Sequence, residues 1–385
     1  MTASHPCRIA HLTSVHPRHD TRIFVKQCRS LARHGYDVTF VVADGLGDAR
    51  EDGVAIVDVG RSGGRLRRML SATRRVLRRA IALDAVVYHL HDPELIPVGL
   101  CLKRMGKTVV YDAHEDLPRQ IRGKTYLPSW MRGPLAGLAE RYQHHALPRL
   151  DGVVAATPSI ASQMGALAPL VATVANYPIP EELDADTAWD ERRQEVCYVG
   201  GLSRLRGVLE IVQAGERLRS PVRIRLAGRF LEAEVARTAR AMPGWRRVDE
   251  LGHLDRTGVR DVLARAMAGL VTLHPLVSYL DALPVKMFEY MAAGIPVIAS
   301  NFPLWREIVE DSACGLCVDP KDPTAIAEAI DYLVDHPDEA ARMGERGRRA
   351  VQEQYNWPGE EKKLLTFYEG ILNGHSALSR LGVAT

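Results

Sequence analysis

The segment 280–300 holds the densest group of residues that could do chemistry. A proline and a glycine near its two ends predict a helix between them. Lys286 falls in the first turn of this helix, where unpaired backbone N–H groups attract anions, and Asp281 and Glu289 supply carboxylates nearby. A nucleotide diphosphate fits such a helix start, with a carboxylate for its ribose hydroxyls. A plain amphipathic helix with solvated charges explains the same residues equally well.

A second candidate anion site follows a predicted strand, where a pair of glycines leads into two arginines. Backbone N–H groups at a glycine turn and guanidinium forks can together bind phosphate. A flexible strand–helix turn with exposed arginines is the alternative interpretation. The residues of this site are Gly200, Gly201, Arg204 and Arg206.

Histidines at predicted strand ends form a third group. His114 is flanked by carboxylates, so it could move a proton or contact a sugar, although a structural role is the alternative. His89 and His91 point to one face of another strand, which makes a metal site conceivable, but no residue with third-ligand spacing follows. Cys314 and Cys317 have CxxC spacing without a second pair. We therefore expect no metal.

Strand and helix patterns alternate through the chain, which predicts parallel sheets with helices on both faces. Ligands bind such sheets at the carboxyl ends of the strands. The dinucleotide motif G-x-G-x-x-G is absent, which argues against a nicotinamide or flavin enzyme. The predicted strands are 8–12, 37–43, 54–59, 85–90, 108–112, 152–156, 171–175, 195–199, 222–226, 269–273 and 296–299. The predicted helices are 23–33, 65–83, 94–105, 131–147, 205–218, 232–241, 257–266, 285–293, 324–334, 338–354 and 360–372.

The composition indicates a soluble globular chain of two or three domains, with 385 residues, 46% hydrophobic and 25% charged. Disordered, collagen-like and disulfide-framework classes are excluded. The formal charge of +3 hides a split at Pro180, with 24 basic and 15 acidic residues before it (+9) and 26 and 32 after it (−6). We expect no nucleic-acid partner. The six cysteines lie mostly in apolar runs and no signal peptide or spanning segment is recognisable, so we expect a cytoplasmic protein, soluble or peripheral.

The segment 63–83 is the main source of the basic half. Its apolar residues recur at helical spacing and arginines occupy much of the rest, which predicts a basic amphipathic helix. Attraction to anionic lipid contributes roughly 1 kcal/mol per basic residue near the surface. The alternative is a helix packed on the sheet with solvated arginines. The predicted membrane-facing residues are Arg67, Arg68, Arg74, Arg75, Arg78, Arg79 and Trp130.

Together these segments resemble the retaining GT-B glycosyltransferases of family 4, of the bacterial polysaccharide type. The segment 281–320 is the most specific part and matches the family's E-x7-E signature, with Asp281 at the first position. The segment 198–207, His114, the linker at 176–178 and the opening 13–24 add to the resemblance. The resemblance implies an α/β fold with two Rossmann-like domains facing each other across a cleft. It places an acceptor-binding domain at 1–178 and a nucleotide-sugar-binding domain at 190–358, with a helix at about 360–385 packing back on the first.

The resemblance also implies roles for individual residues. Glu289 would hold the donor ribose, Asp281 would lie by the transferred sugar, Arg206 would bind the pyrophosphate, and His114 would lie near the anomeric centre. The implied catalytic residues are His114, Asp281 and Glu289. The implied donor-binding residues are Gly200, Gly201, Arg204, Arg206, Gly228, Gly252, His253, Lys286 and Glu289. The implied acceptor-side residues are Ser14, His16, Arg18, Asp20, Arg22 and His91.

Three departures from the family pattern concern the donor sugar and the first loop. Asp281 stands where the family has a glutamate, Gly201 stands where it has an arginine, and the histidines of 16–19 replace a glycine pair. These departures leave the expected fold unchanged.

The expected activity is transfer of a sugar from a nucleotide diphosphate sugar to a hydroxyl of a lipid-linked glycan acceptor, in surface polysaccharide biosynthesis, with retention. No cofactor or metal is expected; catalysis would rest on positioning and charge stabilisation. The expected partners are the nucleotide sugar, the glycan acceptor and an anionic inner-leaflet membrane surface. The alternatives are a soluble natural-product acceptor, and a related nucleotide-sugar epimerase or inactive binding protein.

Overall fold

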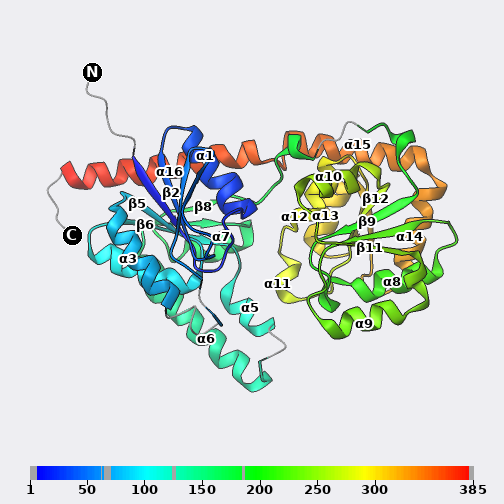
Figure 1. Cartoon of the computed structure of the whole chain (residues 1–385), viewed down its shortest axis with the longest axis horizontal. Helices are drawn as coiled ribbons and strands as arrows, with labels where there is room; N and C mark the ends of the chain where they lie inside the picture. The colour runs from blue at the N-terminus through cyan, green and yellow to red at the C-terminus, as the bar shows by residue number, and fades with distance from the viewer. Residues whose placement is uncertain (1–6, 62, 65–70, 124–126, 184–186, 381–385) are drawn as a thin grey trace. The chain divides into compact units, whose positions relative to one another are not determined.

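A computed structural model of the chain describes residues 7–61, 63–64, 71–123, 127–183 and 187–380, with side chains up to 373 (Figure 1). The chain divides into two compact units. Unit 1 comprises Met1–Asn176 and Glu360–Thr385, and unit 2 comprises Tyr177–Gly359. Each unit has its own sheet of mainly parallel strands with helices around it, which confirms the predicted α/β class.

Unit 1 contains an eight-stranded sheet in the order β3-β4-β2-β1-β5-β6-β7-β8. The central strands are buried throughout, as expected for parallel strands covered on both faces. The sequence pattern missed β3, a short and polar strand that pairs antiparallel with β4 at the sheet edge. The strands are β1 (Arg8–Leu12), β2 (Asp37–Val42), β3 (Ala49–Glu51), β4 (Val54–Asp58), β5 (Val87–Leu90), β6 (Thr108–Ala113), β7 (Gly152–Ala155) and β8 (Val171–Thr173).

The helices of unit 1 include the predicted ones, with local differences, and two short helices at 117–123 and 158–165 that the sequence pattern missed. The first begins as a π-helix, η1, whose start Asp20 caps by accepting from the backbone N–H groups of Arg22 and Ile23. Of the predicted basic helix, residues 65–70 lie outside the described residues. The helices are η1 (Thr21–Cys28), α1 (Arg29–Arg33), α3 (Thr73–Leu83), η3 (Pro93–Leu95), α4 (Ile96–Arg104), α5 (Leu117–Gly123), α6 (Ser129–Ala146), η4 (Leu147–Arg149) and α7 (Pro158–Gly165).

Unit 2 contains a six-stranded parallel sheet in the order β11-β10-β9-β12-β13-β14. The prediction missed β11, which has one buried position and two acidic ones, and β14, which lies at the sheet edge. The strands are β9 (Glu195–Val199), β10 (Arg223–Ala227), β11 (Val248–Gly252), β12 (Ala268–Val271), β13 (Val297–Ser300) and β14 (Gly315–Val318).

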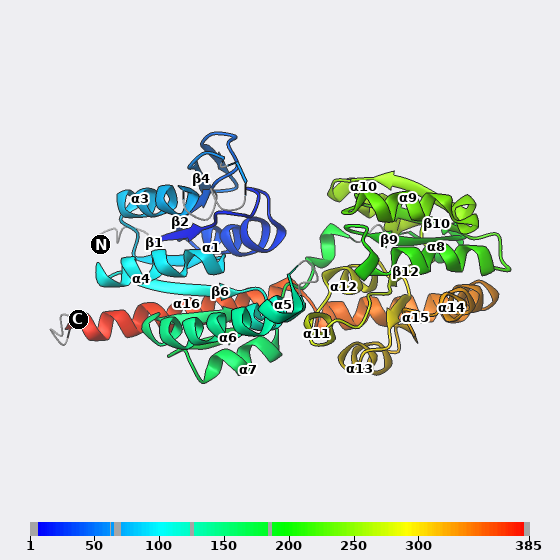
Figure 2. The same ribbon diagram turned by 90° about the horizontal axis from the view of Figure 1, so that it is seen from below.

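Helices flank the second sheet, and the last one returns to unit 1 (Figure 2). From Glu360 on, α16 belongs to unit 1, where Phe367 and Ile371 lie over Gly152 of β7; a Cβ on this glycine would stand 2.8 Å from Phe367 Cζ. The helices are η5 (Pro180–Glu182), η6 (Trp189–Glu191), η7 (Arg204–Arg206), α8 (Val208–Arg217), α9 (Ala233–Ala241), η8 (Pro243–Arg247), α10 (Arg256–Arg265), α11 (Val277–Leu280), α12 (Val285–Ala292), α13 (Pro303–Asp311), α14 (Pro323–Asp335), α15 (Pro337–Glu353) and α16 (Trp357–Arg380).

Candidate active site

In unit 1 the polar side chains gather where β1, β5 and β6, which are neighbours in the sheet, end. Asp92, just after β5, accepts hydrogen bonds from the Thr13 hydroxyl at 2.9 Å and from the Ser14 backbone N–H at 2.6 Å. This carboxylate therefore holds the loop that follows β1. The loop carries His16, whose Nε2 lies 3.4 Å from Asp92 and whose Nδ1 lies 3.1 Å from Asp20.

Asp112, near the end of β6, is the centre of this group. Its carboxylate receives a two-pronged contact from Arg22, at 3.0 Å and 2.7 Å, and a hydrogen bond from Gln27 at 2.7 Å. His91 Nδ1 and His114 Nε2 lie 3.3 Å and 3.2 Å from the same oxygen, Oδ2. Burial alone would raise the pKa of Asp112, but Arg22 and the two histidines outweigh it and hold the pKa well below its usual range. Asp112 is therefore an ionised, fully buried carboxylate.

His114 and His16 are the members of this group that keep exposed surface. Their side chains are 21% and 27% exposed and their ring centres lie 5.1 Å apart. Burial lowers the pKa of His16, but Asp20 and Asp92 outweigh it, and the net shift is upward. The structure thus brings two of the predicted residues, His114 and His16, together at one strand edge.

Three other predicted acceptor-side residues are buried beneath this strand edge and contact protein groups there. Arg18 is buried against Asp44, with two hydrogen bonds of 2.8 Å, and it also donates to the Gly47 carbonyl. Arg22 and His91 are buried beside Asp112. Their contacts correct the expectation that these three side chains face an acceptor, because each is engaged within the protein.

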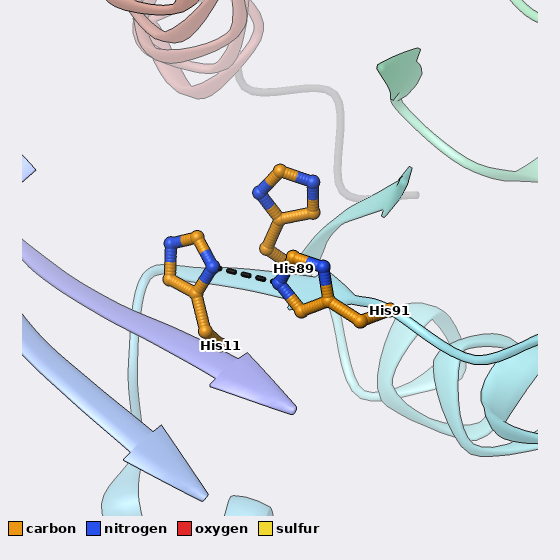
Figure 3. Close-up of side chains that lie close together, drawn as sticks. All are labelled: His11, His89 and His91. Carbon is orange, nitrogen blue, oxygen red and sulfur yellow. Dashed lines mark hydrogen bonds between the residues drawn. The ribbon is translucent and has the colours of Figure 1, made fainter. Parts of the chain in front are cut away.

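Beneath this edge, His11, His89 and His91 stack on β1 and β5 (Figure 3). His11 supplies the third histidine that the linear spacing missed, because a neighbouring strand brings it beside the other two. His11 Nδ1 lies 2.8 Å from His91 Nε2, which is hydrogen-bonding distance. Burial holds the pKa of both His11 and His89 well below the usual range, so they are neutral.

A second group with metal-ligating atoms consists of His91, Asp112 and His114. Four nitrogen donors already surround the Asp112 oxygen that faces the two histidines, and one of them belongs to the Arg22 cation. A metal ion there would lack a free lone pair and would meet a positive charge. The donor set fits hydrogen bonding better than metal coordination.

In unit 2 the predicted anion site forms where β9 runs into its glycine pair. The backbone at Gly228, which follows β10, passes very close to the backbone at Gly200. A Cβ on Gly228 would stand 1.8 Å from the Gly200 carbonyl oxygen. A Cβ on Gly200 would lie 3.1 Å from Lys286 Nζ and 3.9 Å from Arg206 Nη1. Two cations therefore converge on the glycine turn. Among the described residues, neither has a recorded carboxylate partner.

Of these two cations, Lys286 is the one whose charged group lacks a hydrogen-bond partner among the described residues. Its Nζ is buried and lies 3.6 Å from the centre of the Tyr198 ring. Burial, with Arg206 nearby, holds the pKa of Lys286 well below its usual range. Glu289 attracts this ammonium but offsets only part of the downward shift of its pKa. A buried ammonium with no hydrogen-bonded anion is costly unless one binds beside it. This geometry fits the phosphates of a ligand.

Glu289 lies in α12, one turn beyond Lys286, and is 12% exposed. Its Oε1 accepts a hydrogen bond of 2.6 Å from Arg256, whose other nitrogen donates to Glu182 at 3.0 Å. Arg256 thus orients the carboxylate that was predicted to hold a ribose. Asp281, the other predicted carboxylate, is exposed in the turn between α11 and α12.

A pocket of about 390 Å³ lies against the same glycine turn. Arg204, the remaining predicted cation, is exposed at the start of η7. Gly252 ends β11 in a left-handed conformation. The pocket is lined by Val199, Gly200, Gly201, Ala227, Gly228, Arg229, Leu231, His253, Leu254 and Val259.

The predicted basic helix is present from Thr73 on. Arg74, Arg78 and Arg79 are exposed, whereas Arg75 donates to the carbonyls of Val59 and Gly60. Arg75 is therefore a structural residue, which corrects the expectation that it faces a membrane. Arg67 and Arg68 lie outside the described residues. Trp130, at the start of α6, is 75% exposed. Within the described residues, no helix is both long and apolar enough to span a bilayer.

Comparison with known proteins finds a glycosyltransferase family model for each half of the chain. Residues 21–173 match the model described as Glycosyltransferase Family 4, and residues 180–350 match the one described as Glycosyl transferases group 1. The chain belongs to the family 4 glycosyltransferases of the GT-B fold. It is 25% identical over 313 residues to the MMP alpha-(1->4)-mannosyltransferase of Mycolicibacterium hassiacum, which covers 78% of this chain and 74% of the relative.

Solved structures share the fold at low sequence identity. Sucrose-phosphate synthase from Thermosynechococcus elongatus superposes with a TM-score of 0.75 at 18% identity, over 96% of this chain and all of that chain. HepE of Anabaena in complex with UDP-glucose gives 0.72 at 14% identity, over 94% and 99%. These likenesses show the GT-B fold.

Several residues that build the site escaped the sequence analysis. Asp112 stands two positions before His114, so both side chains point to one face of β6; this spacing was a usable signal. Tyr198 and Asp92 lie close to predicted site residues in the sequence, but their partners Lys286 and Thr13 are distant in the sequence. Arg256 and its partner Glu289 are likewise distant, so the sequence carries no signal for these contacts.

Proposed function

We propose that the protein transfers a sugar from a nucleotide diphosphate sugar to a hydroxyl of a glycan acceptor, with retention of the anomeric configuration. The observation that carries this proposal is the convergence of Lys286 and Arg206 on the glycine turn, where Lys286 Nζ is buried and has no hydrogen-bond partner in the part of the chain that the structure describes. Diphosphate oxygens would supply the missing negative charge. Glu289 would bind the ribose, and the neighbouring pocket would receive the base.

The proposed chemistry needs positioning and charge stabilisation rather than a covalent nucleophile. The two cations would stabilise the leaving diphosphate as negative charge develops on it. His114 would contact the substrate in unit 1. We propose that no metal or cofactor takes part, which is supported by the crowding of the Asp112 oxygen by four donors. The mannosyltransferase relative supports a hexosyl donor.

We further propose that the acceptor is lipid-linked, in surface polysaccharide synthesis, and that unit 1 contacts the inner face of the plasma membrane. The exposed arginines of α3 and the exposed Trp130 support this docking. The second candidate is a soluble acceptor. It is favoured by the internal contacts of Arg75, which leave fewer free cations on the helix.

Donor turnover tests the first proposal. We would assay sugar release from UDP-, GDP-, dTDP- and CMP-sugars, with thermal unfolding beside each nucleotide; a ligand at 100 times its Kd should add about 2.7 kcal/mol of stability. Glu289→Ala should weaken nucleotide binding. The transferase proposal fails if no donor is turned over and this variant binds nucleotides as the wild type does. The anomer of the first product, read by NMR, tests retention.

Vesicle sedimentation tests the membrane proposal. With vesicles that contain acidic lipid, the protein should sediment, and changing Arg74, Arg78 and Arg79 to Glu should release it. The matched control changes three exposed arginines of unit 2, Arg237, Arg260 and Arg349, to Glu. If neither variant nor the wild type sediments, or if both variants lose binding equally, docking through α3 is rejected and the soluble acceptor is favoured.

A further inference from the structure

A chain of hydrogen-bonding side chains runs from the strand edge of unit 1 into its interior. Asp112 Oδ2 lies 3.3 Å from His91 Nδ1, and His91 Nε2 lies 2.8 Å from His11 Nδ1. His11 Nε2 lies 3.4 Å from the hydroxyl of Tyr368, which lies 2.8 Å from His89 Nδ1. All five residues are fully or almost fully buried. Figure 3 shows the three histidines and the His11–His91 contact.

The ionised carboxylate fixes where each proton of the chain lies. His91 Nδ1 lies 3.3 Å from Asp112 Oδ2 and 3.4 Å from His114 Nε2. Because the ionised carboxylate can only accept, we assign the His91 proton to Nδ1, so its Nε2 is bare and accepts from His11 Nδ1–H. His11 Nε2 is then bare and accepts the Tyr368 hydroxyl proton, and the Tyr368 oxygen accepts from His89 Nδ1–H. The atom left over is His89 Nε2, which is buried and unpaired. It is a bare acceptor in this arrangement, so every N–H and O–H of the chain has a partner.

The same reasoning applies to His114 on the other side of Asp112. Its Nε2 lies 3.2 Å from the carboxylate and 3.4 Å from His91 Nδ1. With the His91 proton on Nδ1, the carboxylate is the acceptor for both histidines, which places the His114 proton on Nε2. Its Nδ1 has no recorded partner among the described residues and is not buried, and the side chain is 21% exposed. In its neutral form His114 therefore presents a bare Nδ1, which accepts a hydrogen bond.

We propose that Asp112 is the positioning residue of His114, and that the buried chain through His91 and His11 to Tyr368 holds Asp112 in the arrangement that this requires. His114 then accepts a hydrogen bond from a hydroxyl of the sugar or of its acceptor rather than donating to a phosphate. This inference rests on the proposed transferase function. It also gives helix α16 a part in the site, because Tyr368 of α16 links His11 to His89 in this row of hydrogen bonds.

Arg22 and Gln27 also fix the orientation of the Asp112 carboxylate. Arg22 holds both oxygens of Asp112, and Gln27 donates to the oxygen that also faces the histidines. The orientation of the carboxylate is set from its far side by these two residues and from the interior by His91. Among the described side chains that contact Asp112 directly, His114 is therefore the one that keeps exposed surface for a ligand.

The test uses the full-length protein with 15N-labelled histidine. In the wild type, His114 should show a directly bonded proton on Nε2 and the chemical shift of a bare nitrogen on Nδ1. Tyr368→Phe should change the spectra of His11 and His91 and lower kcat by about threefold or more. Asp112→Asn should lower kcat on the order of 10- to 100-fold, as loss of supporting partners does elsewhere. The KM for the donor should change by less than about twofold.

The matched control is Tyr88→Phe. Tyr88 is a fully buried tyrosine of unit 1 whose hydroxyl donates to the Ala80 carbonyl at 2.8 Å, away from the chain. This variant should lower the melting temperature as Tyr368→Phe does but leave kcat and the His114 spectrum unchanged. A proton on Nδ1 of wild-type His114 would overturn the inference, as would wild-type kcat in both Asp112→Asn and Tyr368→Phe. If the wild type turns over no donor, the proposed function fails, while the spectra still decide the positioning.

Discussion

The ammonium of Lys286 lies 3.6 Å from the centre of the Tyr198 ring, with its nitrogen buried and unpaired among the described residues. A cation above an aromatic face gains some of the stabilisation that it loses on leaving water. That gain does not replace a hydrogen-bonded anion. The buried ammonium therefore lowers the stability of the ligand-free protein, and a bound anion would restore it. The predictions for unit 2 follow from this relationship.

Lys286→Met should change binding and stability in opposite directions. Losing a charge-assisted contact to the diphosphate should weaken donor affinity by about 10- to 100-fold, which corresponds to about 1.5–3 kcal/mol. The ligand-free protein should melt at the same or a higher temperature, because an unpaired buried charge is gone. Calorimetric titration and thermal unfolding measure the two effects. Lys321→Met, at an exposed lysine of the same unit, should change neither; a lower melting temperature in Lys286→Met would contradict this account.

Donor affinity should also depend on pH through Lys286. Its pKa in the free protein lies well below 10.5, because burial disfavours the charged form. A bound diphosphate favours the ammonium and raises the pKa again. Between the two pKa values, binding takes up a proton, so affinity should fall as pH rises through that window. Titration in buffers of different ionisation enthalpy measures the uptake. The uptake should vanish in Lys286→Met, and its persistence there would assign the proton to another group.

Arg256→Met should raise the donor KM by about fivefold or more with little change in kcat. The guanidinium contacts Glu289 at 2.6 Å and fixes the carboxylate that, under the proposed function, would bind substrate and transition state alike. Glu182→Gln is the matched control, since it removes only the outer partner of Arg256 and should have a smaller effect. Steady-state kinetics decide the matter; an unchanged KM in Arg256→Met would mean that Glu289 needs no such support.

Gly228→Ala should destabilise unit 2 and abolish donor binding. Its Cβ would stand 1.8 Å from the Gly200 carbonyl oxygen, so the two backbones would have to separate, at a cost of about 3 kcal/mol. Gly137→Ala, in α6 with no atom near its would-be Cβ, should be neutral or stabilising by about 0.5–1 kcal/mol. Thermal unfolding and nucleotide binding measure both variants. Wild-type binding in Gly228→Ala would show that the loops have room to shift.

The fold was within reach of the sequence because its signals are local. Alternating strand and helix patterns, and a resemblance that spans most of the chain, led to the α/β GT-B assignment that the structure and the comparisons confirm. The two strands that the pattern missed in unit 2 are polar or lie at the sheet edge, where a buried apolar run is not required.

The candidate site was only partly visible, for a related reason. Lys286 and Glu289 lie on one short helix, so their spacing reveals them. The partners that give them their properties come from elsewhere: Tyr198 from β9 and Arg256 from α10. Such pairs form only when the chain folds, and a single sequence does not record them. The same holds for His11 and His91, which neighbouring strands bring together.

The return of α16 to unit 1 also bears on the order in which the chain folds during synthesis. Unit 2 is continuous in sequence, whereas unit 1 needs residues from Glu360 on to cover Gly152 and to place Tyr368 beside His11. Those residues leave the ribosome after the whole of unit 2, about 10–40 s later than Asn176 at ordinary elongation rates of about 5–20 residues per second. Unit 1 is thus begun before unit 2 and completed after it, so Tyr368 can join the buried histidines only after unit 2 has been synthesised.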